Sequence, residues 1–242
     1  MSEETCKEAI RIIRTIECYF PNGPNVRGSA FLVDDSGVLV TCAHVVVNGL
    51  GERANEIRVT KIDGDSYKGH VGQIDLRHDI ATIETGIDEK APRISASLPN
   101  LGKQVIFAGQ PQGISKPSVF PGMVSGVGLN LLNRPKCELI QISGMVNNGN
   151  SGGPVLDANT NEVIGVITAK YVPLLQEIDK LTEMLEAIPQ FPSDVGIGNI
   201  DFARFVNITI SSMWQLGAVL RLVQVGTGWA VPVQYFTEIG VL

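Results

Sequence analysis

Short apolar runs rich in Val, Ile and Thr recur along the chain, and Gly, Pro, Asn or Asp separates each run from the next. Examples are "GSAFLV", "VLVTCAHVVV", "IATIET", "QVIFAG", "ELIQISG" and "EVIGVITAKYV". The sequences "DDSG" (34–37) and "DANTNE" (157–162) have the composition of hairpin turns. Closely spaced strands with such turns are typical of an all-β sandwich or barrel. A break at 91–102 divides the strands into two similar sets, which predicts one unit over 1–97 and another over 98–242.

Two segments depart from this pattern and indicate helices. Thr5 and Glu8 have the spacing of a capping box, which predicts a short helix from about 6 to 14. In "PLLQEIDKLTEMLEAI" the apolar residues recur at steps of four and three, as on one face of a helix, at Leu174, Ile178, Leu181, Leu185 and Ile188. A second apolar element follows, to about 223. We therefore expect 173–225 to form a mainly helical insertion into the β fold.

Composition places the chain among soluble globular proteins. Of its 242 residues 44% are apolar and 18% charged, whereas disordered chains are poorer in apolar groups. The net charge of −6 argues against a nucleic-acid partner. No uninterrupted apolar stretch reaches transmembrane length, and the start, "MSEETCKEAIRII", lacks the pattern of a secretory signal, which predicts a cytoplasmic protein. The four cysteines are scattered and are expected to be free thiols: Cys6, Cys18, Cys42 and Cys137.

Three short motifs carry candidate chemistry: "TCAHVV" with His44, "RHDIAT" with Asp79 and "GNSGGP" with Ser151. A serine hydroxyl becomes a good nucleophile only when a neighbouring base takes its proton, and that base needs a third group to hold its tautomer. The chain supplies one residue for each of these roles. The sequence therefore predicts a nucleophilic serine activated by a histidine–aspartate pair.

The glycines around Ser151 predict a second part of the same site. Without a Cβ, Gly149 can present its backbone N–H to a developing oxyanion together with the N–H of Ser151, so the oxyanion hole is expected over Gly149, Asn150 and Ser151. Gly152 and Gly153 would let the chain turn back behind the nucleophile.

Other titratable residues leave an alternative open. Asp75 could orient His44, although only Asp79 begins an apolar strand. His70 and His78 lie in polar sequence and are predicted to be exposed. No carboxylate pair, phosphate loop or metal-ligand spacing competes with the three motifs, so the sequence predicts neither a metal nor a cofactor.

The ordered set of motifs resembles the trypsin-like (chymotrypsin-fold) serine peptidases, most closely the HtrA/Deg branch. The segments that carry the resemblance are "GSAFLVDDSGVLVTCAHVV", "HDIATIE", "GNSGGPVLDANTNEVIGVITA" and "GTGWAVPVQYF". The resemblance implies two six-stranded antiparallel β-barrels, with an N-terminal helix before them and the insertion within the second barrel. It also implies a serine endopeptidase that needs no cofactor, with His44 as general base, Asp79 orienting it and Ser151 as nucleophile.

The resemblance further implies where a protein or peptide substrate would bind. The strand around Thr168, Ala169 and Lys170 would pair with the substrate backbone, and Met145 would occupy the floor of the specificity pocket. An apolar floor disfavours Arg or Lys at the cleavage site, while Lys170 could admit an acidic group, so small apolar and acidic side chains both stay open. HtrA/Deg proteins normally carry a PDZ domain, and this chain stops just after the catalytic unit.

Two other functions remain open on the same fold. The cleft could hold peptides without turnover, because a distorted oxyanion loop silences a complete triad. The protein could instead work as a chaperone-like or assembly factor, with 173–225 as its partner surface. A homo-oligomer formed through 173–225 is also among the expected assemblies.

Overall fold

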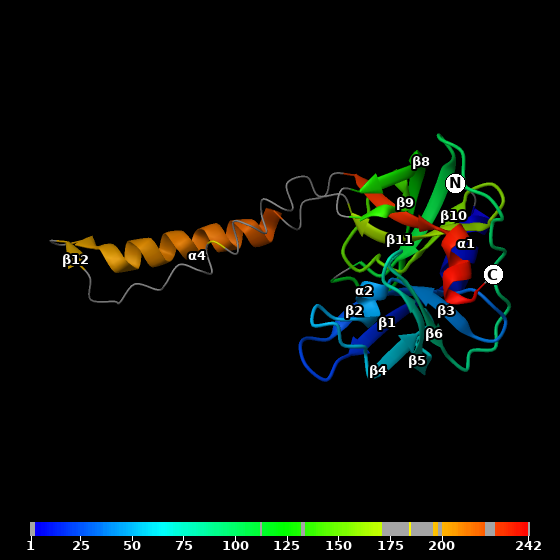
Figure 1. Ribbon diagram of the computed structural model, residues 1–242, viewed down its shortest axis with the longest axis horizontal. Coiled ribbons are helices and arrows are strands. Elements are labelled where there is room, and N and C mark those ends of the chain that lie inside the picture. Colours follow the sequence, from blue (N-terminus) through cyan, green and yellow to red (C-terminus); the bar gives the residue numbers. More distant parts are fainter. Residues whose placement is uncertain are drawn as a thin grey trace. The chain divides into compact units, whose positions relative to one another are not determined.

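The computed structural model describes residues 3–111, 113–131, 134–170, 184, 196–197, 200–220 and 226–241. The chain divides into two compact units, one of Met1–Lys170 with Gly226–Leu242 and the other of Tyr171–Val225. The first unit contains two closed antiparallel barrels of six strands each (Figure 1). The all-β, chymotrypsin-like architecture expected from the sequence is therefore confirmed.

The first barrel has the strand order β1, β2, β3, β6, β5, β4, and pairing of β1 with β4 closes it. Its strands are β1 (Ile13–Tyr19), β2 (Val26–Leu32), β3 (Val38–Thr41), β4 (Glu56–Thr60), β5 (Ser66–Asp75) and β6 (Ile80–Glu84). The expected turn at "DDSG" joins β2 to β3: the N–H of Val33 donates to the carbonyl of Val38 (3.0 Å), and Gly37 has a φ of +87°.

The second barrel has the order β10, β11, β14, β9, β8, β7, and β10 pairs with β7 to close it. Its strands are β7 (Gln104–Gly109), β8 (Ser118–Leu131), β9 (Arg134–Gly144), β10 (Pro154–Asp157), β11 (Val163–Lys170) and β14 (Thr227–Pro232). The expected turn at "DANTNE" connects β10 to β11, with Asn161 at a φ of +61°. The predicted boundary at 97/98 falls in the connection between β6 and β7.

The expected N-terminal helix is present as α1 (Glu3–Ile12), but its start differs from the prediction. Thr5 lies inside the first turn and is fully buried, together with Ala9 and Ile12 on the same face. Its hydroxyl donates to the carbonyl of Ala158 (3.2 Å) and also contacts the Asn161 side chain. The capping-box interpretation is therefore wrong, because Thr5 lies two residues inside the helix and the Glu8 carboxylate accepts hydrogen bonds from Arg11.

Two apolar clusters hold the barrel unit together. One fills the second barrel and includes Phe107, Ile140 and Ile167. The larger cluster fills the first barrel and continues to α1 and to the closing 3-10 helix η1 (Val233–Ile239). Val233, Phe236 and Ile239 of η1 are buried, every third residue, as one face of a three-residue-per-turn helix requires.

The second unit is described only in part. It contains the long helix α4 (Phe202–Leu220) and a pair of short strands, β12 (Gly196–Ile197) and β13 (Ile200–Asp201). The helical part of the predicted insertion is thus present in α4, whereas the stripe from Leu174 to Ile188 lies outside the described residues. Within the described part of the chain, α4 included, no helix is both long and apolar enough to cross a bilayer.

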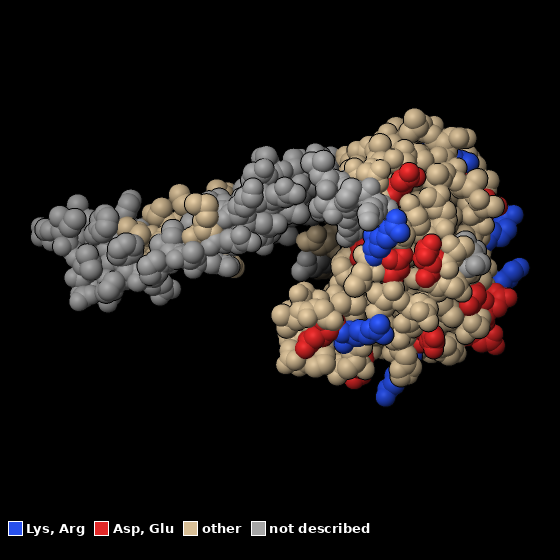
Figure 2. Space-filling model, in the orientation of Figure 1, with Lys and Arg blue, Asp and Glu red and all other residues tan. Residues whose placement is uncertain are grey.

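On the face of the barrel unit drawn in Figure 2, acidic and basic side chains lie interspersed. A buried ion pair lies beneath the surface: Arg14 Nη2 is 2.6 Å from the Glu89 carboxylate, and the arginine side chain is only 1% exposed. Lys61 reaches the same carboxylate at 2.9 Å. Burial alone would raise the pKa of Glu89, but these two cations outweigh it and lower that pKa.

Candidate active site

His44 lies in α2 (Ala43–Val46), a single helical turn that directly follows β3. The apolar neighbours Val45 and Val46 are buried and anchor this turn in the first barrel. The His44 side chain is 45% exposed, so it is the accessible member of an otherwise apolar segment. The "HVV" pattern therefore produces a fixed backbone that presents one imidazole at the surface.

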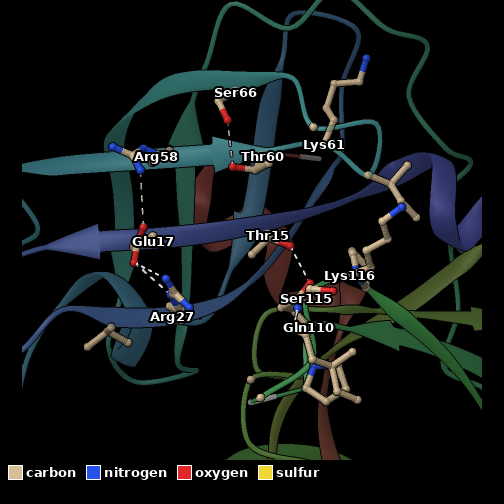
Figure 3. Close-up of a pocket in the computed structure, with 18 of the residues that line it drawn as sticks. Thr15, Glu17, Arg27, Arg58, Thr60, Lys61, Ser66, Gln110, Ser115 and Lys116 are labelled. Carbon is tan, nitrogen blue, oxygen red and sulfur yellow. Dashed lines mark hydrogen bonds and ion pairs between the residues drawn. The ribbon is translucent and has the colours of Figure 1, made fainter.

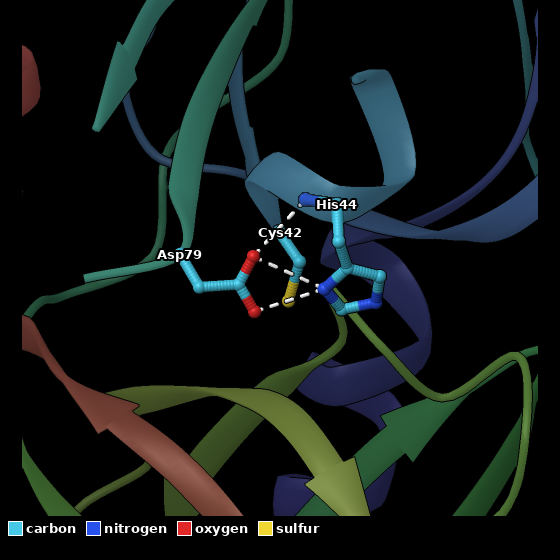
Figure 4. Close-up of side chains that lie close together, drawn as sticks. All are labelled: Cys42, His44 and Asp79. Atoms are coloured by element: carbon cyan, nitrogen blue, oxygen red, sulfur yellow. Dashed lines mark hydrogen bonds and ion pairs between the residues drawn. The ribbon is translucent and has the colours of Figure 1, made fainter. Parts of the chain in front are cut away.

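Asp79 precedes β6 and holds the imidazole in place (Figure 4). Its carboxylate oxygens lie 2.9 and 3.1 Å from His44 Nδ1, and Oδ1 also accepts the backbone N–H of His44 (3.0 Å). Oδ2 accepts a hydrogen bond from the hydroxyl of Thr168 in the second barrel. The carboxylate is 5% exposed, and these donors compensate for the cost of burying its charge.

Asp79 has a φ of +61°, a region that few residues other than glycine adopt. The carboxyl of Asp75 meets a different histidine, because it contacts Nδ1 of His78. The carboxylate that contacts His44 is thus that of Asp79. Asp75, the alternative left open by the sequence, contacts His78.

His78 is buried, so the prediction that it is exposed is wrong, whereas His70 is exposed as expected. The His78 ring stacks on the ring of Tyr235, with centroids 3.8 Å apart. Tyr235 comes from the C-terminal η1, more than 150 positions along the chain. The polar sequence around His78 gives no signal of this partner, which only the tertiary fold brings into contact.

Ser151 lies just after a tight turn that leads into β10. The N–H of Asn150 donates to the carbonyl of Asn147 (3.1 Å), and Gly149 has a φ of +91°, the left-handed value that the third residue of a type II turn requires. The first barrel holds this turn through Ser29, whose N–H donates to the Ser151 carbonyl (2.9 Å) and whose hydroxyl donates to the Gly149 carbonyl (2.8 Å).

The hydroxyl of Ser151 donates to the carbonyl of Thr168 at 3.2 Å. In the described part of the chain it makes no hydrogen bond to His44. Thr168 thus contacts both halves of the site, with its side chain on Asp79 and its carbonyl on Ser151. The side-chain contact to Asp79 is a feature that sequence reasoning missed.

Gly152 and Gly153 allow the chain to turn behind Ser151, as expected. Gly152 has a φ of +84°, and a Cβ there would overlap the carbonyl oxygen of Ser29 and the hydroxyl of Thr41. A Cβ on Gly153 would overlap the carbonyl oxygen of Ala108. The close approach of these backbones leaves no room for any larger residue at either position.

The three predicted oxyanion residues differ in the state of their N–H groups. The N–H of Asn150 closes the turn, so it is not free to bind an oxyanion as predicted. Among the described residues, the N–H groups of Gly149 and Ser151 have no acceptor. The Asn150 side chain is fully buried, and neither of its amide atoms has a hydrogen-bond partner in the described structure. It packs against Gly109, where a Cβ would come within 2.6 Å of it.

The predicted substrate strand is β11. Ala169 pairs with Trp229 and Lys170 with Gly228 of β14, while Thr168 is buried at the register shift between Ile167 and Ala169. Met145 follows β9 and is 60% exposed, so no enclosed pocket surrounds it in the described structure. Its role at the floor of a specificity pocket stays a prediction.

A groove of about 850 Å³ begins at the turn before Ser151 (Figure 3). Asn148 and Gly149 line one end, and the rest is formed by β1, the start of β2, β4 with the turn that leads into β5, and the connection before β8. Thr15 of β1 donates to the side chain of Gln110 (2.9 Å), which ties the two barrels together across the groove. Its charged lining consists of Glu17, Arg27, Arg58, Lys61, Asp63 and Lys116.

One further cluster can hold a metal ion. The thiol of Cys42, the imidazole of His44 and the carboxylate of Asp79 place one ligand atom each within 4.8 Å of one another (Figure 4). None of the four cysteines forms a disulfide, and Cys18, Cys42 and Cys137 are buried whereas Cys6 is half-buried. Burial raises the pKa of the Cys18 thiol to about 12, with a smaller contribution from Glu17.

Comparison with known proteins agrees with this geometry. The family described as "Trypsin-like peptidase domain" matches residues 28–166, the part that carries all three motifs. A probable periplasmic serine endoprotease DegP-like from Chlamydia trachomatis is 37% identical over 148 residues, which is 60% of this chain and 28% of that protein. Human serine protease HTRA3 is 35% identical over 62% of this chain and 34% of its own length. The chain thus matches about a third of the length of these relatives.

Among solved structures, an HtrA-type protease AlgW bound to a tripeptide superposes with a TM-score of 0.65. The superposition covers 98% of this chain and 61% of that one, at 20% sequence identity. At this level of identity the likeness supports the fold alone.

Proposed function

Because the chain belongs to the trypsin-like peptidase family, we propose that it is a serine endopeptidase that hydrolyses peptide bonds through an acyl-enzyme on Ser151. The observation that carries the proposal is the His44–Asp79 pair, joined through Thr168 to the turn that presents Ser151. An imidazole whose Nδ1 is held by a carboxylate has its Nε2 available as a base, which is the requirement for activating a serine.

In the proposed reaction, the Ser151 hydroxyl leaves the carbonyl of Thr168 and turns to Nε2 of His44. His44 takes the hydroxyl proton as Ser151 Oγ attacks the scissile carbonyl, and it then gives that proton to the leaving amine. A water molecule next attacks the acyl-enzyme with the same assistance and restores the free serine. Asp79 stays ionised throughout and stabilises the imidazolium that forms in each half-reaction.

The N–H groups of Gly149 and Ser151 are proposed to bind the oxyanion of each tetrahedral intermediate. Their lack of acceptors in the described structure supports this role. Removing one such donor typically costs about 10²–10³ in rate. The N–H of Asn150 is omitted from the proposal because the turn uses it.

The substrate is proposed to be an extended protein or peptide segment. On one side of the scissile bond its backbone would pair with β11 near Thr168, Ala169 and Lys170. The groove beyond Gly149 is proposed to take the other side, since its lining comes from the first barrel and the connection before β8. Met145 and Lys170 are proposed to influence the residue preferred at the cleavage site, where small apolar and acidic side chains both remain candidates.

A second candidate is a gated site of the same fold, silent until a ligand rearranges it. The observation that favours it is the Ser151 hydroxyl, which contacts Thr168 in place of His44. Catalytic hydrogen bonds of uncomplexed enzymes are often loose and tighten only with substrate, so the same observation is compatible with an active enzyme. The two candidates differ in whether the serine reacts without an activator.

A fluorophosphonate probe tests both candidates, because it forms a covalent bond only with an activated serine. Labelling of the wild type that Ser151→Ala and His44→Ala both abolish would support the enzyme. Labelling that begins only after addition of a peptide would favour the gated site. Absence of labelling under every condition, in protein shown to be folded by circular dichroism, would exclude the proposed activity.

Location and assembly remain proposals. The cytoplasmic location expected from the sequence stays a prediction, and the DegP-like relative is named as periplasmic. A homo-oligomer formed through 173–225 is likewise proposed. α4 exposes several large apolar side chains that such contacts could use, among them Met213, Trp214 and Leu216.

A further inference from the structure

Cys42 occupies an unusual place beside the histidine–aspartate pair. It sits between the end of β3 and the start of α2, two residues before His44, and its side chain is fully buried. Figure 4 shows its sulfur on the same side of His44 as the Asp79 carboxylate. The thiol donates to the carbonyl of Ile167 on β11 (3.1 Å), so Cys42 lies where the two barrels meet.

The three side chains form a donor set that suits zinc. Thiolate sulfur, imidazole nitrogen and carboxylate oxygen are the ligands this ion prefers, and three protein ligands with an open fourth position are a common arrangement. Tetrahedral coordination needs these atoms about 3.3–3.6 Å apart. In the structure they already lie within 4.8 Å, and His44 Nδ1 is 2.9 Å from Asp79. Small side-chain adjustments would therefore complete the site.

We propose that Zn²⁺ binds to Cys42, His44 and Asp79 and thereby inhibits the protein. The exposed imidazole provides the path of entry, because the other two ligands are buried. Binding breaks the S–H bond of Cys42 and releases its proton to solvent, and it breaks the thiol's hydrogen bond to Ile167. The imidazole proton leaves Nδ1, which becomes a ligand, and Nε2 is the nitrogen that carries a proton in the bound form.

Inhibition follows from this change of tautomer. An imidazole protonated on Nε2 and bound to zinc through Nδ1 has no lone pair left to accept the proton of Ser151. The metal also occupies the carboxylate that otherwise orients His44. The inhibitory consequence rests on the proposed peptidase function, whereas zinc binding itself does not depend on it.

Binding is therefore measured first, by competition with a chromophoric zinc chelator on the Ser151→Ala protein, which cannot digest itself. Adding Cys42→Ala should weaken zinc affinity by about tenfold or more. Removing a group that only supports a metal ligand already costs about tenfold, and Cys42 is proposed to be a ligand itself. Cys42→Ser serves as a second variant, because its hydroxyl keeps a donor for the Ile167 carbonyl but is a poor zinc ligand. Cys6→Ser and His70→Gln remove donors elsewhere and should leave the affinity unchanged.

Inhibition is measured second, on the serine-containing protein, with each variant compared with its own metal-free rate of fluorophosphonate labelling. Zn²⁺ should slow labelling of the wild type, Mg²⁺ should not, and excess chelator should restore the rate. Equal zinc affinity with and without Cys42 would overturn the proposed site, whatever the activity. Tight Cys42-dependent binding with an unaltered labelling rate would overturn the inhibition alone. An unlabelled wild type would count against the proposed function while leaving the binding result valid.

Discussion

The two halves of the candidate site are built in different ways. On the first-barrel side, His44 and Asp79 are held by side-chain hydrogen bonds around a buried carboxylate. On the second-barrel side, Ser151 is held by the shape of its backbone, with glycines at 149, 152 and 153 and bonds from Ser29 to two carbonyls. The first half should therefore respond to changes of charge and proton position, and the second to changes of volume.

Asp79→Asn should have the largest effect on activity. The amide cannot hold the imidazole in the required tautomer, and the rate should fall by about 10⁴-fold, the loss expected when a triad loses its carboxylate. Fluorophosphonate labelling or peptide turnover measures it. Asp75→Asn is the matched control, because Asp75 contacts His78 and should change the rate by less than about tenfold. Equal losses in both variants would refute the assignment of Asp79.

Gly152→Ala tests the second-barrel half of the site, around Ser151, through the stability of the folded protein. An added Cβ would overlap Ser29 and Thr41 at a left-handed φ, and we expect a loss of about 3–5 kcal/mol in the free energy of unfolding. Urea denaturation followed by circular dichroism measures it. Gly51→Ala is the control: Gly51 also has a positive φ, +78°, but nothing lies within 4 Å of its Cβ position, so only the backbone strain of about 1 kcal/mol should appear.

Thr168→Val should break the link between the two halves. Valine keeps the size of the side chain but removes one of the hydrogen-bond donors to the Asp79 carboxylate. Loss of a hydrogen bond to a buried charged group costs about 1–3 kcal/mol, which should lower the rate about 10–100-fold. The loss should appear in kcat more than in KM, because the carboxylate acts through His44. Thr168→Ser keeps the hydroxyl and should restore most of the rate; failure of this rescue would indicate that packing, not the hydrogen bond, is what Thr168 contributes.

Glu89→Gln should have the smallest effect and should depend on pH. Lys61 and Arg14 hold the pKa of Glu89 below its usual value, although burial opposes them. A carboxyl whose pKa is lowered by folding stabilises the folded state at any pH above its unfolded-state pKa of about 4.3. This stability is lost as the pH falls through the folded-state pKa. We expect the variant to lose about 1–2 kcal/mol in the free energy of unfolding at pH 7. This is less than the loss on breaking a fully buried ion pair, because Glu89 is partly exposed.

The pH dependence of this difference is a check on the explanation. The difference in unfolding free energy between wild type and variant should begin to shrink as the pH falls below about 4.3, and it should vanish only below the lowered folded pKa, where Glu89 is protonated too. Glu17→Gln removes the partner of Arg27, whose side chain is 74% exposed, and should cost less than about 1 kcal/mol at every pH. A gap for Glu89→Gln that stays constant with pH would contradict the electrostatic explanation.

The sequence predicted those features that depend on short, local patterns. Short apolar runs and hairpin turns predict an all-β sandwich or barrel, and the resemblance carried by the ordered motifs implies two barrels. The motifs around His44, Asp79 and Ser151 identify residues that the fold brings into one unit. What it could not predict depends on contacts between distant segments. The sequence predicts Thr5 as a helix cap, but in the structure its hydroxyl contacts Ala158 and Asn161. It predicts His78 as a surface residue, but the ring of Tyr235 stacks on it.

Cys42 illustrates the same limit for chemistry. Its spacing from the other cysteines predicts no metal site, because the sequence shows only that His44 is two residues away. Asp79 enters the cluster through the pairing of β3 with β6, and Ile167 through the contact between barrels. A ligand set of this kind becomes visible only when side chains from separate strands are seen together.

The ends of the Tyr171–Val225 segment also have an evolutionary consequence. Lys170 and Gly228 are paired across β11 and β14, and the carbonyl of Gly226 accepts the N–H of Gly144, so the barrel itself holds the two ends of the segment together. Lengthening a connection between fixed ends costs only about 0.6 kcal/mol per doubling of its length. Lineages could therefore replace this segment wholesale, acquiring new partners or controls while the barrels and their chemistry are inherited unchanged.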